Sequence, residues 1–244
     1  MRLHRFIASC GLTSRRRAEL LIEAGRVTVN GKVVSHVGQI VNPARDRVAV
    51  NGEEIAPPEP LTIAFNKPRG IITSTHDTHE RLTVMDLLPR SLQLRGVLPV
   101  GRLDQDTEGL LVLTNDGELQ NRIAHPRYET EKEYRALVAG QPGADELRRL
   151  EGGVRIEGHR TAPARVLSVT REGTRARIEL VIHEGKKRQV RRMFEAIGHD
   201  VLELERTRIG NVQLGDLPRG AWRELTAGEI RGLTRAPDRA GGRR

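Results

Sequence analysis

The first 55 residues carry two helical patterns followed by two strand pairs. Apolar side chains recur at the i, i+3, i+4, i+7 spacing of one helical face at Leu3, Phe6, Ile7 and Cys10. A second helix is predicted between Ser14, which can cap it, and Gly25. β-Branched runs then flank the pairs Asn30-Gly31 and Asn51-Gly52. Asn-Gly favours a tight hairpin because both central residues of that turn take a positive φ. The pattern therefore predicts two helices followed by a small antiparallel sheet.

The pattern changes after residue 55. Residues 56–60, APPEP, hold three prolines in five positions and predict an extended linker. Residues 61–234 mix strand-like and helix-like stretches without a repeating βαβ rhythm. That mixture favours an α+β domain with a mixed, largely antiparallel sheet flanked by helices. Residues 235–244 show no apolar periodicity and predict a disordered basic tail.

Within residues 61–234, individual elements follow from the same patterns. Strands are predicted on both sides of the turn at 67–70, over the apolar run 110–114, and over the alternating stretches 131–140 and 175–185. Helices are predicted over 84–89, 143–153 and 186–199. A further short helix is expected to begin with a capping box formed by Asn115 and Glu118.

Charge and composition narrow the class of protein. The 244 residues include 41 Lys and Arg against 32 Asp and Glu, and this balance of +9 favours a polyanionic partner such as nucleic acid. Cys10 is the one cysteine, which excludes an internal disulfide. No apolar run approaches the ~20 residues that span a bilayer, and the N-terminus lacks the apolar stretch of a secretory signal. We therefore expect a cytoplasmic protein without a membrane partner.

Sequence motifs for cofactors and metals are absent. The chain contains no G-x-x-x-x-G-K, no G-x-G-x-x-G and no H-E-x-x-H. His76 and His79 lie three residues apart in a polar loop, with no obvious third ligand. We therefore expect neither a cofactor nor a metal ion.

Three basic residues open the second predicted helix. Arg15, Arg16 and Arg17 occupy its first turn, where positive charge opposes the helix dipole. A bound phosphate at that helix end would turn the unfavourable arrangement into an attractive one. The alternative is a basic face that is simply solvated. We predict that these residues bind RNA phosphates.

The loop GRLDQDTEGLL, residues 101–111, combines charge with glycine just before an apolar strand. In an extended loop the side chains of Arg102 and Asp104 point to the same side, because side chains alternate. Such a loop can aim a carboxylate at a ligand. The alternative is that its Asp side chains bond nearby backbone amides.

A second basic segment follows the strand predicted at 175–185. Its cations are Lys186, Lys187, Arg188, Arg191 and Arg192. This density predicts phosphate binding, and a solvated face remains the alternative, above all for Lys186 and Lys187. An arginine next to a carboxylate would also keep that carboxylate ionised.

Several segments resemble one known family. RLHRFIASCGLTSRRRAELLIEAGRVTVNGKVV resembles the S4 RNA-binding domain. FNKPRG, GRLDQDTEGLLVLTNDG, EKEY and EGKKRQVRRMFEAIGH resemble, in order, four motifs of the rRNA pseudouridine synthases that carry an S4 domain. The resemblance extends to about residue 232 and is strongest to the large-subunit branch. It implies an S4 domain over residues 1–55 and a catalytic domain over 61–234.

The resemblance also implies roles for single residues. Asp104 matches the nucleophilic aspartate, and Tyr134 matches the residue that stacks on the target uracil. Arg191 matches the basic partner of that aspartate, and Arg102 the arginine that fills the space left by the flipped base. Lys67, with Pro68, matches a motif that packs beneath the catalytic loop. A plain core tyrosine is the alternative for Tyr134.

The implied activity is the isomerisation of one uridine in a structured stem-loop of 23S rRNA by a monomer that uses no cofactor. Three alternatives stay open. The target could lie in 16S rRNA, or the chain could be a non-catalytic RNA-binding factor in ribosome assembly. An unrelated N-glycoside hydrolase would share carboxylate chemistry at C1′, but it would release free uracil.

Overall fold

The computed structural model describes residues 1–75 and 77–234, and these form two compact units. The first comprises Met1–Leu61, Leu88–Leu98 and Thr114–Gly117, and the second comprises Thr62–Leu87, Pro99–Leu113 and the chain from Glu118 onward. His76 and the basic tail predicted at 235–244 lie outside the described residues. The domain boundaries at residues 55 and 61 stay predictions.

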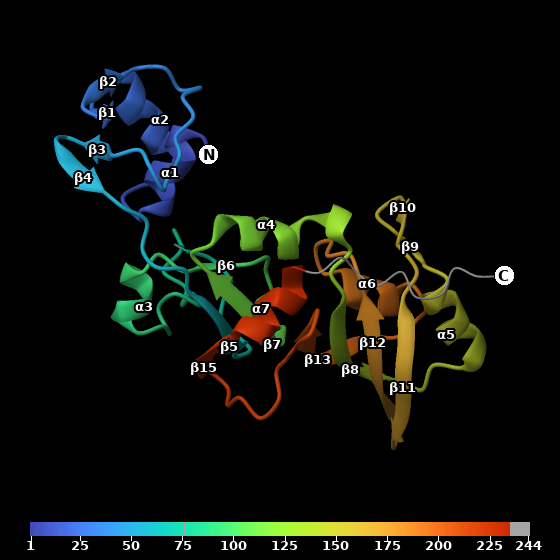
Figure 1. The fold of residues 1–244 in the computed structure, drawn as a ribbon. Helices are drawn as coiled ribbons and strands as arrows, with labels where there is room; N and C mark the ends of the chain where they lie inside the picture. The colour runs from blue at the N-terminus through green and yellow to red at the C-terminus, as the bar shows by residue number, and fades with distance from the viewer. Residues whose placement is uncertain (76, 235–244) are drawn as a thin grey trace. The chain divides into compact units, whose positions relative to one another are not determined.

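The first unit contains the two helices and two strand pairs that the local patterns predict, and a further helix, α3, that they do not (Figure 1). They are α1 (Leu3–Ser9), α2 (Arg15–Glu23), β1 (Val27–Val29), β2 (Lys32–Val34), β3 (Val48–Val50), β4 (Glu53–Ile55) and α3 (Arg90–Leu94). The strands form an antiparallel sheet in the order β2-β1-β3-β4. Asn30 and Asn51 have φ of 51° and 55°, as the Asn-Gly hairpins require. The hydroxyl of Ser14 caps α2 by accepting from the N–H of Arg17. Both hairpins and the cap are confirmed.

Residues 56–61 have no regular structure, and Asn115 holds this segment in place. Its Oδ1 accepts from the N–H of Leu61 at 2.7 Å, and its Nδ2 donates to the carbonyl of Glu59 at 3.0 Å. The capping role predicted for Asn115 is wrong. The helix α4 spans Gly117–Ala124, so Asp116 and not Asn115 precedes its first residue.

The second unit is built on a mixed sheet, and its α+β class is confirmed. Within the described residues its strands are β5 (Thr62–Lys67), β6 (Leu98–Pro99), β7 (Glu108–Thr114), β8 (Lys132–Ala139), β11 (Arg165–Glu172), β12 (Arg175–Ile182), β13 (Val201–Ile209), β14 (Val212–Gln213) and β15 (Trp222–Glu224). The main order is β11-β12-β8-β13-β7-β5-β15. β13 pairs parallel with β7 and antiparallel with β8. β13 therefore lies between β8, which carries Tyr134, and β7, which follows the loop of Asp104.

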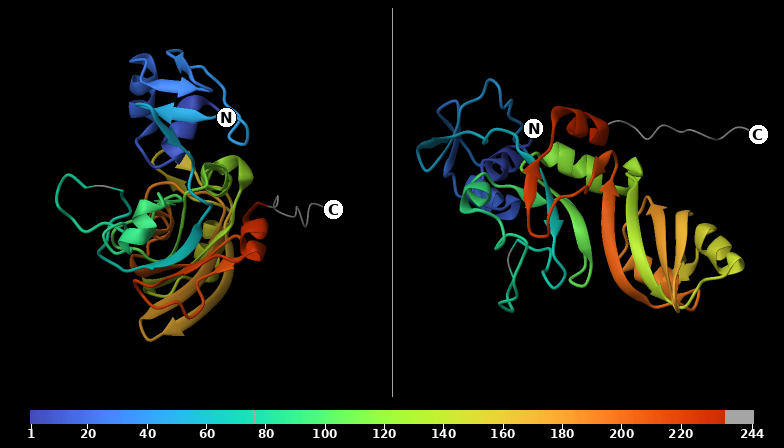
Figure 2. Two further views of the ribbon diagram at one scale, coloured as in Figure 1. Left: turned by 60° about the vertical axis from the view of Figure 1, so that its left-hand side comes forward. Right: turned by 90° about the horizontal axis from the view of Figure 1, so that it is seen from below.

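Helices pack on the sheet (Figure 2). They are α4, α5 (Ala144–Glu151), α6 (Gln189–Glu195) and α7 (Ala227–Thr234), with a short 3-10 turn η1 (Pro126–Tyr128) after α4. The strands β9 (Arg155–Ile156) and β10 (His159–Arg160) form a separate small hairpin. Leu119 of α4 and Leu233 of α7 share one core cluster with Leu110 and Val112 of β7. No helix in the described part of the chain is long and apolar enough to cross a membrane.

Two predicted elements are absent from the described structure. No second strand follows the turn at 67–70, where Ile72 makes a single bridge to Thr83. β5 already lies between β7 and β15, so neither of its edges is free for a hairpin partner. The helix predicted over 84–89 is a turn. Its Asp86 carboxylate accepts from both the N–H and the hydroxyl of Thr83 at 2.8 Å, and Pro89, which follows, has no N–H to extend a helical hydrogen-bond ladder.

Candidate active site

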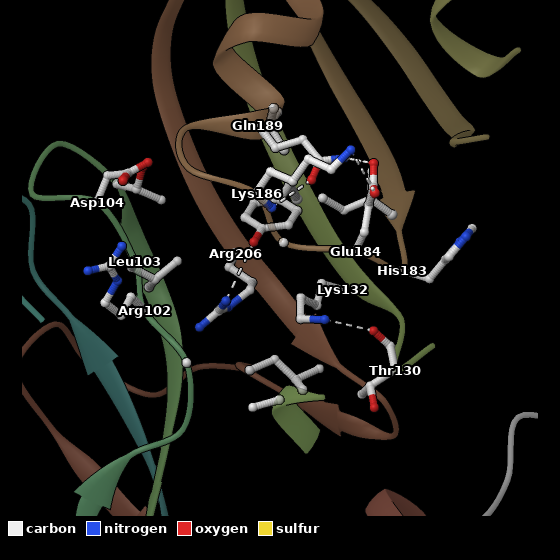
Figure 3. A pocket seen from close by; sticks show the side chains of 18 of the residues that line it. Arg102, Leu103, Asp104, Thr130, Lys132, His183, Glu184, Lys186, Gln189 and Arg206 are labelled. Atoms are coloured by element: carbon white, nitrogen blue, oxygen red, sulfur yellow. Dashed lines mark hydrogen bonds and ion pairs between the residues drawn. The ribbon is translucent and has the colours of Figure 1, made fainter. Parts of the chain in front are cut away.

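A cavity of about 270 Å³ lies in the second unit, where three chain segments meet (Figure 3). The loop before β7 contributes Arg102 and Asp104, and β8 contributes Lys132 and Tyr134. The segment after β12 contributes residues 183–190, and β13 contributes Arg206. Three of the predicted site residues outside that last segment, Arg102, Asp104 and Tyr134, therefore line one cavity.

A buried lysine holds the loop that carries Asp104. Lys67 is 0% exposed at the end of β5, and its Nζ donates to the carbonyl of Thr107 at 2.8 Å. The same Nζ also reaches the carbonyls of Pro68 and Gln105. Burial lowers the pKa of Lys67 to about 8, although the nearby carboxylates of Asp106 and Asp104 oppose that shift. Lys67 thus lies beneath the loop, as the resemblance implies.

Asp104 is half-buried, and among the described residues its carboxylate makes no hydrogen bond and no ion pair. Its backbone carbonyl accepts from the N–H of Thr107 and closes the loop. Next to it, the N–H and carbonyl of Leu103 both bond the hydroxyl of Thr73. The loop is therefore fixed through its backbone while the Asp104 side chain stays available on the cavity wall. The alternative in which this Asp bonds nearby amides does not hold.

Arg191 is bound to a different aspartate from the one expected. Its Nε lies 3.2 Å from Oδ2 of Asp106, and its Nη2 donates to the Asp106 carbonyl at 2.8 Å. The direct pairing expected with Asp104 is absent from the described residues. Asp106 follows Asp104 by two positions, and its carboxylate also pairs with Arg188 at 3.0 Å. Arg191 therefore braces the loop from behind, and it is not part of the cavity lining.

Tyr134 is 8% exposed on β8, and it lines the cavity. In the sheet register it pairs with Leu180 of β12 on one side and with Arg206 of β13 on the other. Its hydroxyl accepts from Nη1 of Arg206 at 3.5 Å. The ring is therefore held in place from the sheet, while one part of it borders the cavity.

Sequence reasoning missed two cations of this cavity, Lys132 and Arg206. Lys132 precedes Tyr134 by two residues, so strand alternation places both on one face. Arg206 follows the buried Leu204 by two residues, again on an inward position of a strand. The alternation of inward and outward positions along both strands could have identified these cations. They were missed because only apolar residues were assigned to the inward positions.

The basic segment after β12 is partly paired within the protein. Lys186, Lys187 and Arg188 are exposed at the cavity. Lys186 lies 3.6 Å from a carboxylate oxygen of Glu184, whereas Arg192 lies away from the cavity lining and pairs with Glu157 at 2.6 Å. RNA binding by these residues stays a prediction. No group of three or more His, Cys, Asp or Glu side chains in the described ranges is placed to hold a metal ion.

Comparison with known proteins identifies the family of the chain. The family model for RNA pseudouridylate synthase matches residues 62–196, and the S4 domain model matches residues 1–48. The ribosomal large subunit pseudouridine synthase B of Bacillus subtilis (strain 168) is 46% identical over 239 residues, which cover 97% of each chain. The dual-specificity RNA pseudouridine synthase RluF of Escherichia coli (strain K12) is 40% identical over 94% of this chain and 77% of its own.

A solved structure supports the same family assignment. A crystal structure of pseudouridylate synthase aligns with a TM-score of 0.68 and 32% identity, and the alignment covers 96% of this chain and 99% of that one. The matched regions include the loop of Asp104, the strand of Tyr134 and the segment of Arg191. The chain therefore belongs to the RNA pseudouridylate synthase family, as a pseudouridine synthase with an N-terminal S4 domain.

Proposed function

We propose that this enzyme converts one uridine of ribosomal RNA, in the 23S rRNA, to pseudouridine, with Asp104 as its nucleophile. The observation that carries the proposal is the unpaired Asp104 carboxylate on the wall of a cavity that Tyr134 also lines. The relative with 46% identity is named for the large ribosomal subunit, which supports the 23S assignment. We further propose that the enzyme acts as a monomer in the cytoplasm.

The proposed chemistry needs one carboxylate and a pocket that retains the base. The target nucleotide leaves its stack at a cost of a few kcal/mol, which backbone contacts elsewhere offset. Asp104 attacks C1′ or C6, or it stabilises the intermediate. Stacking on Tyr134 is worth about 1–3 kcal/mol and keeps the detached uracil in place while it turns. The uracil rejoins C1′ through C5, and the C5 proton then leaves.

The exposed Lys186, Lys187 and Arg188 are well placed to hold phosphates at the cavity. Arg102, also exposed and without an ion pair in the described structure, supports the proposal that it enters the space of the flipped base. Arg191 contributes indirectly in this scheme, because it fixes Asp106 and thereby the loop.

Mapping of pseudouridine in rRNA tests the proposal. Cells that lack the protein should lose pseudouridine at one 23S position, and the wild-type protein should restore it. A site lost only from 16S rRNA would redirect the proposal to the small subunit. No lost site in either rRNA would contradict it, and free uracil released from RNA by the purified protein would favour a hydrolase. Because one relative is named for dual specificity, the other RNAs of the same cells should be mapped as well.

Replacement of Arg15, Arg16 and Arg17 by Ala should weaken RNA binding and flatten its salt dependence. All three are exposed on the first turn of α2. Each lost phosphate contact reduces the slope of log K against log salt by roughly 0.7–0.9, so the triple variant should lose about 2–3 in slope. Filter binding of an rRNA fragment between about 50 and about 300 mM salt measures the slope.

A variant with Ala at Arg171 and Arg175 is the control, because these arginines are exposed in the β11–β12 hairpin outside every predicted RNA contact. For each arginine replaced, the slope of log K against log salt should change far less in this variant than in the triple variant. Equal changes in the two variants would remove the argument for a phosphate site on α2.

A further inference from the structure

Arg206 is a buried cation without a counter-charge. It is 3% exposed in β13, and among the described residues it makes no ion pair. Its Nε donates to the carbonyl of Leu110 at 2.8 Å, and its Nη1 reaches the hydroxyl of Tyr134. Its Nη2 is buried and has no hydrogen-bond partner. A buried guanidinium with a free N–H is costly unless a ligand completes its bonds.

A second cation shares this part of the cavity. Lys132 is half-buried on β8, and its Nζ donates to the carbonyl of Thr130 at 3.0 Å. Burial, together with repulsion from Arg206, lowers the pKa of Lys132 to about 8. The neighbouring carboxylates are already engaged, since Glu131 and Glu133 both pair with Arg208. Neither Arg206 nor Lys132 therefore makes an ion pair among the described residues.

The place of Arg206 in the sheet puts this charge at the reaction centre. β13 lies between β8, which carries Tyr134, and β7, which follows the Asp104 loop. Figure 3 shows the Arg206 side chain between the Asp104 loop and Lys132. Asp104, Tyr134 and Arg206 all line the same cavity. A nucleoside that meets Asp104 and stacks on Tyr134 would bring its base next to the guanidinium.

We propose that Arg206, with Lys132 beside it, is the site that stabilises the uracil as an anion after it leaves C1′. The inference rests on the proposed function. On the route in which Asp104 attacks C1′, the electron pair of the N1–C1′ bond stays on uracil when that bond breaks, and C1′ is held by an oxygen of Asp104. When C5 of the uracil then bonds to C1′, the carboxylate leaves with the electron pair of the C1′–O bond. The C5 proton passes to a base, and N1 takes up a proton from solvent. Between cleavage of the N1–C1′ bond and formation of the C5–C1′ bond, the base carries a full negative charge.

The same cations could instead hold a phosphate, but their location favours the base. Phosphate contacts come from exposed side chains in most complexes, and here Lys186, Lys187 and Arg188 supply them at the cavity. Arg206 is buried and bonded to the phenol of Tyr134, the group on which the base is proposed to stack. Preorganised donors at a buried position stabilise developing charge most strongly.

The test compares uridine with 5-fluorouridine at the mapped position of an rRNA fragment under single-turnover conditions. Fluorine stabilises a negative charge on uracil, so the substituted base depends less on the protein. Arg206→Met should lower the rate of N1–C1′ cleavage of uridine about 10²-fold or more, with little change in RNA affinity. The loss should be clearly smaller with 5-fluorouridine, and Arg206→Lys should restore part of the rate.

Lys187→Met is the matched control, because Lys187 is an exposed cation on the same cavity. Any loss in that variant should be equal for both bases. Equal losses for both bases in Arg206→Met, or a loss in affinity alone, would overturn the inference. A methylphosphonate at the target nucleotide that reduces the wild type to the level of Arg206→Met would assign Arg206 to phosphate instead. A wild-type enzyme that leaves the fragment unmodified would overturn the proposed function itself, and a thermal melt identifies a variant that fails to fold.

Discussion

Asp104→Asn should abolish pseudouridine formation while leaving the fold and the affinity for RNA intact. The amide has the shape of the carboxylate but is neutral and a poor nucleophile, so we expect the rate to fall by at least about 10³-fold. The Asp104 side chain makes no hydrogen bond or ion pair among the described residues, so no protein partner loses its bond in the variant. Pseudouridine at the mapped position, in cells and with the purified enzyme, measures the effect.

Asp106→Asn is the control for this prediction, since it is the other aspartate of the same loop. Its carboxylate pairs with Arg188 and Arg191, so its loss should lower stability and loosen the loop while part of the activity remains. If Asp106→Asn were inactive and Asp104→Asn retained a tenth or so of the wild-type rate, roughly a 1.4 kcal/mol effect, the assignment of the nucleophile would be wrong.

Local signals predicted the first unit well, because each depends on a few neighbouring residues. An Asn-Gly pair has to take positive φ at both positions, and Ser14 has to find a free N–H at the start of α2. Asn115 shows the limit of such signals. Its amide is equally able to cap a helix or to hold a distant segment, and contacts with residues 59 and 61 decide between them.

In the candidate site too, features set by contiguous residues could be predicted, and features set by distant contacts could not. The motif that contains Asp104 is contiguous, so its place before β7 could be predicted from sequence. The partner of Arg191 could not be predicted, because Asp104 and Asp106 differ by two positions of a loop whose path Lys67 fixes from below. Arg206 reaches the cavity only through the pairing of β13 with β7 and β8, and that register includes an irregularity just after Arg206. The sequence shows that a charged residue occupies an inward position of a strand, but it does not show which residues surround that position in the fold.

Gly109→Ala should be the most damaging single substitution to stability in this part of the molecule. Gly109 has a φ of +100° where β7 pairs with β13, and a Cβ there would lie 2.4 Å from the carbonyl oxygen of Arg206. The same Cβ would lie 2.8 Å from the backbone nitrogen of Arg206, so the backbone, and not a flexible side chain, would have to move. Backbone strain alone costs about 1 kcal/mol, and with the clash we expect a loss of at least about 3 kcal/mol in the free energy of unfolding. Denaturation by urea, followed by circular dichroism, measures that loss.

Gly198→Ala separates the two causes. Gly198 has a similar φ of +91°, but a Cβ there would meet nothing within 4 Å. This variant should therefore carry the backbone strain alone, about 1 kcal/mol, and keep its activity. Because the clash at Gly109 displaces the backbone of Arg206, Gly109→Ala should also lose activity under conditions where the protein is still folded. Equal destabilisation in the two variants would mean that β7 and β13 separate at little cost, and the close approach that places Arg206 beside the catalytic loop would then not be a rigid feature of the fold.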